Sequence, residues 1–408
     1  MAAPKRKIIN DPVYGFITID HPLIFDVIQH HDYQRLRRIL QMGLAHLVYP
    51  GAMHTRMLHS LGAYHLMHLA LQELRDKGVE ITPEEDVAAR VAILLHDIGH
   101  GPFSHTLENT LVEGVYHEDI SALIMEKMNR ELDGRLELAI RIFKGDHPKQ
   151  FLHQLVSSQL DVDRMDYLNR DSFYTGVYEG VIGYDRIIKM LTVHDGELMV
   201  EEKGIHSIEK FIIARRLMYW QVYLHKTVLS AENMLIKILA RAKELSLAGE
   251  KLFASPCLAF FLQQKINRAI FVDQPEYLDQ FCRLDDFDIM AAIKVWATHP
   301  DKILSMLCTG VVNRRLFKIK LSTSRFTEEE LQANRHRVME AWGLTAEESA
   351  YFAFSGMAAN RTYNITDETI NILFKTGEVR DISSVENALI NSTVSIPIKK
   401  FYICCPKL

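Results

Sequence analysis

Histidine and acidic residues gather at four places in the first 170 residues, and their types suit a divalent metal ion. The four places are His59, His96-Asp97, His117-Glu118 and Asp163. Imidazole and carboxylate ligands suit Zn, Mn, Fe and similar ions. Two imidazoles and two carboxylates from separate helices would leave two positions of a six-coordinate ion open for water and a phosphate oxygen. The pattern therefore indicates metal-assisted chemistry on a phosphate.

The distribution of histidine points to the same part of the chain. Twelve of the 19 histidines fall at or before position 117, and histidine is both the commonest metal ligand and the side chain that titrates near neutrality. A single His-Asp dipeptide is weak evidence, because a surface pair or a capping interaction gives the same letters. The order of the four places favours the metal interpretation, as does the run Gly99–His105 that follows His96-Asp97 directly.

Helices must carry most of these residues. Thr82-Pro-Glu-Glu85 is a capping box with proline in the first turn, so we expect a helix over 83–99. A His-Asp pair at the buried end of that helix is costly unless it is paired or coordinated. The patterning predicts further helices over 32–42, 53–77, 104–112, 117–130, 134–144, 150–170 and, as one long stretch, 206–246. Later segments mix helices (256–267, 288–307, 327–341, 345–354) with strands near 316–321 and 393–404.

The composition excludes several classes of protein. The 408 residues are 48% hydrophobic and 24% charged, which is typical of a globular protein. A net charge of -5 argues against non-specific binding to nucleic acid or to a membrane surface. The longest apolar runs, such as Val91–Leu95, are far shorter than the ~18 residues of a membrane span. Five cysteines without a C-x-x-C pair favour a reduced, cytoplasmic protein.

Taken together, the motifs resemble those of the HD-domain metal-dependent phosphohydrolases, in particular the deoxynucleoside triphosphate triphosphohydrolase branch. The resemblance covers roughly the first 230 residues and rests on Arg56-x-x-His-Ser-Leu-Gly62, His96-Asp-Ile-Gly-His-Gly-Pro-Phe-Ser-His105, His117-Glu118, Asp161-Val-Asp-Arg-x-Asp-Tyr-x-x-Arg-Asp171 and Tyr223-x-His-Lys226. It implies a mostly α fold, with an HD-domain helical core, short N-terminal strands and a smaller mixed α/β C-terminal part. We expect a catalytic domain over 1–245, with its motif core at 50–175, and a C-terminal region over 246–408.

The resemblance also implies an activity, the hydrolysis of deoxynucleoside triphosphates (dNTPs) to deoxynucleoside and triphosphate. One divalent ion per chain, Mn, Mg, Fe or Zn, would be held by His59, His96, Asp97 and Asp163. The implied catalytic group is His117, which would protonate the leaving 5′-oxygen, with the bracing Glu108 and the adjacent His100. The implied substrate contacts are Arg56, Arg164, Arg215 and His105 for the phosphates, Gln41 and Asp171 for the 3′-hydroxyl, and Tyr167 and Tyr223 for the ribose.

Family members are often homo-oligomers, and the resemblance implies a dimer or tetramer with a nucleotide effector bound between subunits. Lys7, Asn10, Gln34 and Arg37 fall near that effector region, whereas Gln29 stands where the animal enzyme has a guanine-reading Asp.

Two other functions stay open. An HD-type phosphodiesterase or general nucleotidase could use His100, His105 and His117 to hold a second metal ion. A nucleotide-binding or nucleic-acid-binding regulator with an inactive site is disfavoured, because the four-residue set is intact.

Overall fold

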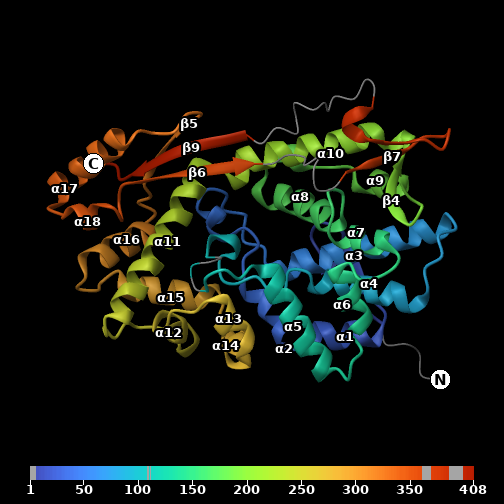
Figure 1. The fold of residues 1–408 in the computed structure, drawn as a ribbon, viewed down its shortest axis with the longest axis horizontal. Helices are drawn as coiled ribbons and strands as arrows, with labels where there is room; N and C mark the ends of the chain where they lie inside the picture. Colours follow the sequence, from blue (N-terminus) through green and yellow to red (C-terminus); the bar gives the residue numbers. More distant parts are fainter. Residues whose placement is uncertain (1–5, 108–109, 111, 361–368, 386–397) are drawn as a thin grey trace.

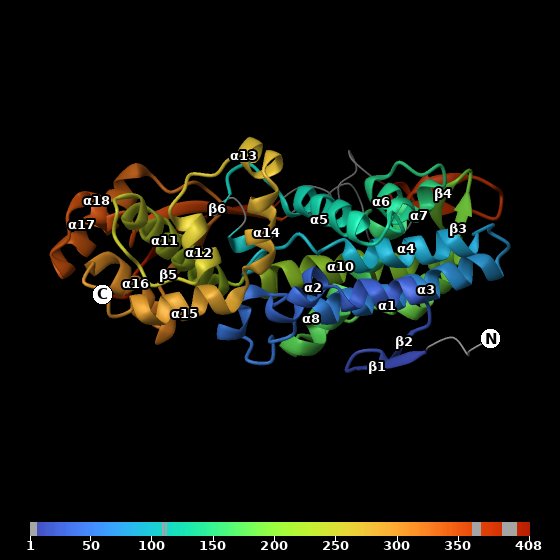
Figure 2. The same ribbon diagram turned by 90° about the horizontal axis from the view of Figure 1, so that it is seen from below.

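Helices dominate the protein, which confirms the predicted mostly α fold. The computed structural model describes residues 6–107, 110, 112–360, 369–385 and 398–408. Helices α3 and α4 lie at one end of the elongated molecule, and α15 to α18 lie at the other (Figures 1 and 2).

The chain up to residue 247 contains most of the helical core. Its elements are β1 (Lys7–Asp11), β2 (Gly15–Ile19), α1 (Pro22–Gln29), α2 (His31–Gln34), α3 (Arg56–Asp76), α4 (Pro83–Leu95), α5 (His117–Glu131), α6 (Glu137–Lys144), α7 (Gln150–Val156), α8 (Val162–Thr175), α9 (Tyr184–Met190), β3 (Leu191–His194), β4 (Glu197–Glu201), α10 (Ile205–Met218) and α11 (Lys226–Leu247). Short helical turns include η1 (Arg35–Arg38), η2 (Gly43–Leu47), η3 (Ser104–Thr106) and the π-helix η6 (Tyr219–Tyr223).

The remaining chain is mixed, as predicted. Its elements are α12 (Pro256–Leu262), α13 (Arg268–Asp273), α14 (Pro275–Arg283), α15 (Asp286–Trp296), α16 (Lys302–Val312), β5 (Lys318–Ser322), α17 (Glu328–Trp342), α18 (Ala346–Ser349), β6 (Phe354–Asn360), β7 (Asn371–Leu373), β8 (Val379–Asp381) and β9 (Ile398–Cys405). The sheets are β1-β2, β3-β4-β7-β8 and β5-β9-β6. Because β7 pairs with β4, the C-terminal region crosses the expected boundary at 245/246, which stays a prediction.

Helix α3 packs against both α4 and α8, and a glycine permits the close approach of α8. A Cβ atom at Gly62 would lie 2.0 Å from Asp166 Oδ1 and 2.1 Å from Arg170 Nη2. No side chain fits at those distances unless the buried side chains of Asp166 and Arg170 shift. The glycine therefore lets α8 bring its acidic residues next to His59 on α3.

The single helix predicted over 150–170 is wrong, because α7 ends at Val156 and α8 begins at Val162. The Asp161 carboxylate accepts hydrogen bonds from the backbone N–H of Ser158 (2.8 Å) and of Arg164 (2.7 Å). An aspartate that caps a helix in this way ends the preceding one. The break places Asp163 in the first turn of α8.

The helices predicted over 32–42 and 104–112 are also too long. Residues 35–38 form a 3-10 turn, and Leu40 then pairs with Thr55 as an isolated β-bridge. In the second segment only η3 is helical among the described residues, and both Phe103 and Ser104 have a φ of 54°. A left-handed backbone at two consecutive residues cannot start an α-helix.

The long helix predicted over 206–246 is interrupted by the π-helix η6 and by a break before His225, whose ring accepts a hydrogen bond from the N–H of Thr227. The helix predicted over 288–307 splits into α15 and α16, because Pro300 lies between them. The helix predicted over 345–354 ends at Ser349, and β6 begins at Phe354. Helices α13 and α14 and strands β6 to β8 were not predicted from the sequence.

Among the helices that the structure describes, we find none with the length and apolarity required to cross a membrane.

The contact at Gly62 yields a stability prediction. We expect Gly62→Ala to lower the free energy of unfolding by about 2 kcal/mol, because the added methyl must displace buried charged side chains. Gly183→Ala is the matched control, because its Cβ would meet nothing within 4 Å. Urea denaturation of both variants measures the difference, and equal stability of the two would contradict the close packing of α3 and α8.

Candidate metal centre and substrate cavity

Four side chains from three parts of the chain converge at one point. His59 lies on α3, His96 and Asp97 directly follow α4, and Asp163 lies on α8. The Nε2 atom of His59 is 3.1 Å from Asp163 Oδ1 and 3.6 Å from Asp97 Oδ2. The Nε2 atom of His96 is 3.5 Å from Asp163 Oδ1 and 3.4 Å from Asp97 Oδ1. The structure thus brings together all four residues that the resemblance implies as metal ligands.

Both imidazoles direct Nε2 toward this point. The Nδ1 of His96 donates to the carbonyl oxygen of Ile93 (2.7 Å), and the Nδ1 of His59 donates to Asp166 Oδ2 (2.7 Å). Their buried Nε2 atoms make no hydrogen bond among the described residues. A divalent cation fits this arrangement, since neutral imidazole and carboxylate are the donors it requires.

Asp166 connects His59 to Arg170, which also forms a buried ion pair with Asp11. Arg170 donates from Nε and Nη2 to the two oxygens of Asp166 (2.9 and 3.0 Å) and from Nη1 to Asp11 Oδ2 (2.8 Å). Burial would raise the pKa of Asp166, but Arg170 and His59 outweigh burial and lower it. An ionised Asp166 fixes the ring orientation of His59, as carboxylates behind metal-binding histidines commonly do.

The charges around His59 affect how a cation would bind. Burial lowers the pKa of His59, but the neighbouring Asp163 and Asp166 outweigh burial and raise the pKa to about 10. A cation that binds Nε2 must therefore displace a proton, so its affinity should fall as the pH falls.

Asp97 also has basic neighbours other than His59 and His96. It forms an ion pair with Arg56, whose Nε donates to Ser104 Oγ at 2.8 Å. His100 Nε2 lies 3.3 Å from Asp97 Oδ1, and the His100 ring stacks on that of His117 at 4.0 Å between centroids. Ligand atoms of Asp97, His100 and His117 all lie within 4.8 Å of one another.

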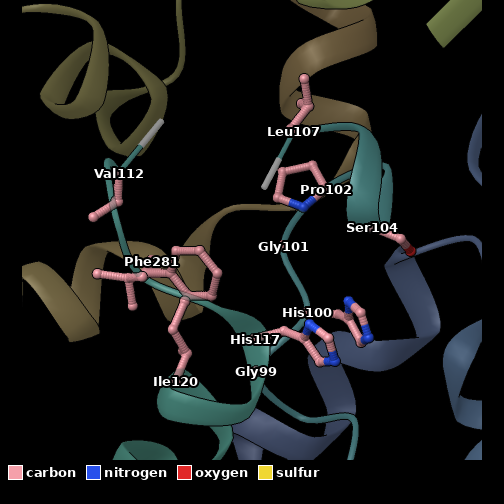
Figure 3. Close-up of a pocket in the computed structure, with 11 residues that line it drawn as sticks. Gly99, His100, Gly101, Pro102, Ser104, Leu107, Val112, His117, Ile120 and Phe281 are labelled. Carbon is pink, nitrogen blue, oxygen red and sulfur yellow. The ribbon is translucent and has the colours of Figure 1, made fainter. Parts of the chain in front are cut away.

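Figure 3 shows the paired rings of His100 and His117 with a small apolar pocket beside them. The pocket has a volume of about 30 Å³, and Val112, Ile120 and Phe281 line it together with the loop 99–104. Both histidines line this pocket, and the side chain of His117 is also 19% exposed and lines the larger cavity described next. Glu108 and the side chain of His105 lie outside the described residues, so their predicted roles stay predictions.

A cavity of about 580 Å³ opens next to the four convergent side chains. The predicted site residues that line it are Gln41, Arg56, His96, Asp97, His100, His117, Asp163, Arg164, Tyr167, Asp171, Arg215 and Tyr223. Four of their buried polar atoms make no hydrogen bond among the described residues, and these are Gln41 Oε1, His96 Nε2, Arg164 Nε and Arg215 Nε. The cavity is thus rich in unsatisfied donors and acceptors, as expected of a binding site for a polar ligand.

Asp171 is held by two side chains, one of which the sequence did not single out as a site residue. The Nε2 of His54 lies 2.7 Å from Asp171 Oδ1, and the hydroxyl of Tyr223 donates to Oδ2 at 2.7 Å. The His54 ring stacks on Tyr174 at 4.4 Å between centroids. His54 opens the motif segment that contains Arg56 and His59, but no spacing rule connects it to Asp171, which is 117 residues away.

Glu232 is a second cavity residue that the sequence did not reveal. It lies one turn after Val228 on α11, and both residues line the cavity. Burial raises the pKa of Glu232 to about 7, although a hydrogen bond with Thr106 lowers it in part. In a helix predicted to run unbroken over 206–246, nothing distinguished this glutamate from a solvated one.

The residues expected near an effector lie apart from this cavity. Lys7 and Asn10 belong to β1, and Arg37 donates from Nε to Gln34 Oε1 at 2.7 Å. None of these four, nor Gln29, lines the cavity described above.

The raised pKa of Glu232 predicts how stability depends on pH. A carboxyl that is harder to ionise when folded costs stability as the pH rises from 4.5, its ordinary value, through about 7. We expect Glu232→Gln to gain roughly 1 to 2 kcal/mol relative to the wild type between pH 5 and pH 8. Urea denaturation at the two pH values measures this gain, with the exposed Glu179→Gln as control. If the difference in unfolding free energy between Glu232→Gln and the wild type is the same at both pH values, the pKa of Glu232 is not raised in the folded protein.

Comparison with known proteins agrees with the motifs. Residues 56–171 match the HD domain, and residues 182–253 match the HD associated region. The chain is 34% identical over 322 residues to the uncharacterized protein YwfO of Bacillus subtilis, covering 77% of this chain and 72% of YwfO. It is 29% identical over 282 residues to the deoxynucleoside triphosphate triphosphohydrolase SAMHD1 of Homo sapiens, covering 58% of this chain and 45% of the human protein.

A solved structure is similar over the whole chain. The crystal structure of a phosphohydrolase from Bacteroides thetaiotaomicron superposes with a TM-score of 0.95 at 52% identity, covering 99% of this chain and 100% of that one. The similarity therefore extends through the C-terminal region, beyond the segments that match the two families. On these grounds the chain belongs to the HD-domain phosphohydrolase superfamily.

Proposed function

We propose that this phosphohydrolase cleaves dNTPs into deoxynucleoside and inorganic triphosphate. The observation that carries the proposal is one continuous cavity that joins the His-Asp cluster to two arginines with unsatisfied Nε atoms and to the Asp171–Tyr223 pair. The similarity to proteins named deoxynucleoside triphosphate triphosphohydrolase, at 29 to 30% identity, supports the same substrate class.

In this proposal His59, His96, Asp97 and Asp163 hold the metal ion. A divalent ion bound there would polarise the α-phosphate and lower the pKa of a bound water. The contribution of the chain is to fix both Nε2 atoms through Ile93 and Asp166, so that the donors are pre-oriented.

Arg164 and Arg215 are suited to bind the triphosphate. Each has a buried Nε without a hydrogen-bond partner among the described residues, and each lines the cavity. Arg164 is positioned by its ion pair with Asp161, and Arg215 donates from Nη1 to Gln159 Oε1 at 3.0 Å. Arg56 is already engaged with Asp97 and Ser104, so its first role is to orient that carboxylate.

His117 is the proposed proton donor. Attack at the α-phosphorus breaks the bond to the 5′-oxygen, and this oxygen must take up a proton as it leaves. His117 lies at the cavity surface and stacks on His100, which fixes the plane of its ring.

The sugar would be held by Asp171 and Gln41. Each oxygen of Asp171 already accepts one hydrogen bond, and a carboxylate oxygen can accept a second from a 3′-hydroxyl. Gln41 Oε1 is a buried acceptor without a partner among the described residues. The rings of Tyr167 and Tyr223 meet edge to face at 6.2 Å between centroids and would pack on the ribose, which disfavours a 2′-hydroxyl.

A second candidate function follows from Asp97, His100 and His117. Their ligand atoms lie close enough to hold a second ion, as in an HD-type phosphodiesterase or general nucleotidase. Two bound ions per chain would favour it, and one would favour the triphosphohydrolase. The nucleotide effector, the homo-oligomer and the cytoplasmic location stay predictions from the sequence.

Product analysis tests the proposal. The protein is incubated with each dNTP and with one ribonucleotide in the presence of Mn or Mg, and the products are separated by anion-exchange chromatography. We expect triphosphate and deoxynucleoside in equal amounts, at least tenfold faster turnover of the deoxy substrate, and at least a hundredfold loss in Asp97→Asn.

The surface variant Asp26→Asn is the control and should keep full activity, since its side chain is 44% exposed and pairs only with Arg135 among the described residues. Release of phosphate or pyrophosphate without triphosphate would reject the reaction. Full activity of Asp97→Asn would reject the site.

A further inference from the structure

The C-terminal region contacts two segments next to the cavity through the carboxylate of Asp286. This residue begins α15 and is buried. Its Oδ2 accepts the backbone N–H of Leu40 (2.8 Å), and its Oδ1 accepts the backbone N–H of Phe103 (2.8 Å). The two partners are 246 and 183 residues away in sequence. A single side chain therefore ties together two segments of the catalytic half.

Both segments carry residues that face the cavity. Leu40 precedes Gln41, and Phe103 precedes Ser104; Gln41, Phe103 and Ser104 all line the cavity. The hydroxyl of Ser104 lies 3.3 Å from the carbonyl oxygen of Leu40 and accepts from Arg56 Nε. Asp286 itself is not among the lining residues, so it acts only through these segments.

The loop that Asp286 holds has a backbone that requires support. Phe103 and Ser104 both have a φ of 54°, a conformation that costs energy in residues with a side chain. Arg35 holds the same loop at its other end, where Nη1 donates to the carbonyl oxygen of His100 at 2.8 Å. Arg35 also packs over the ring of Phe281 on α14, so a second C-terminal element supports this loop.

We propose that Asp286 is a positioning residue for substrate binding, because it fixes the cavity wall formed by Gln41 and Ser104. The identity of the bound substrate rests on the proposed function, but the positioning of the two segments does not. In this proposal the C-terminal region contributes to substrate binding by positioning the cavity wall.

Holding both backbone N–H groups requires a carboxylate at this position. Only a carboxylate accepts two N–H groups at once without presenting a donor of its own. Burial raises the pKa of Asp286 to about 6, so the group is ionised at neutral pH. An asparagine keeps one acceptor, and its amide N–H₂ would face the other backbone N–H, which is then left buried without a partner.

The experiment compares Asp286→Asn and Asp286→Ala with Asp288→Asn in the full-length protein. Asp288 lies in the same turn of α15 and accepts the N–H of Asp285 at 2.8 Å, so it controls for the charge change and for helix capping. Hydrogen–deuterium exchange of peptides covering 36–44 and 99–107 reports the positioning directly. The KM and kcat for a dNTP and the bound metal per chain report its effect on the site.

In Asp286→Asn we expect hydrogen–deuterium exchange of both peptides to be at least tenfold faster than in the wild type. We also expect its KM to be at least fivefold higher, with kcat within threefold of the wild type and the metal content unchanged. Asp288→Asn should match the wild type. Unchanged exchange in Asp286→Asn would overturn the proposal. A fall in kcat at constant KM would overturn it too, because that result indicates a smaller fraction of folded protein. If the wild type hydrolyses no dNTP but exchange accelerates as expected, the positioning role stands and the proposed function fails.

Discussion

Two buried imidazoles and two carboxylates converge on one point, and the rest of the site depends on this arrangement. Charged and polar atoms removed from water are costly unless partners compensate them. Here the outer atoms are compensated by Ile93 and by the Asp166–Arg170–Asp11 chain, whereas the inner Nε2 atoms are left for a ligand. The fold therefore stabilises an arrangement that becomes favourable once a cation is bound.

Several features of the fold follow from this constraint. The absence of a side chain at Gly62 allows α8 to approach α3, and the helix break at Asp161 puts Asp163 in the first turn of α8. Leu95 ends α4 directly before His96-Asp97, so these residues lie at the buried end of a helix. Each of these local features brings together side chains that are far apart in sequence.

The sequence predicted the residues of the cluster better than the elements that carry them. The motifs that contain His59, His96, Asp97 and Asp163 consist of residue types that bind metal ions. The periodicity of the apolar residues predicts the mostly α fold class. The breaks within 150–170 and 206–246 depend on single side chains, Asp161 and His225, that satisfy backbone groups locally. Periodicity does not detect such caps inside a continuous apolar pattern.

Long-range contacts were the other part that the sequence could not supply. Tertiary structure alone pairs His54 with Asp171, and no local pattern predicts this contact. The same holds for the hydrogen bonds of Asp286 with Leu40 and Phe103. Motifs said least about the C-terminal region, yet Phe281 and Asp286 place it against the loop 99–104.

The most direct test of this account is to locate the cation. Anomalous diffraction from crystals grown with Mn shows where the ion binds and which atoms it contacts. We expect one strong peak per chain, bonded to Nε2 of His59 and of His96 and to the carboxylates of Asp97 and Asp163. No peak at this point, or a peak held by Asp97, His100 and His117 without His59 and His96, would contradict it.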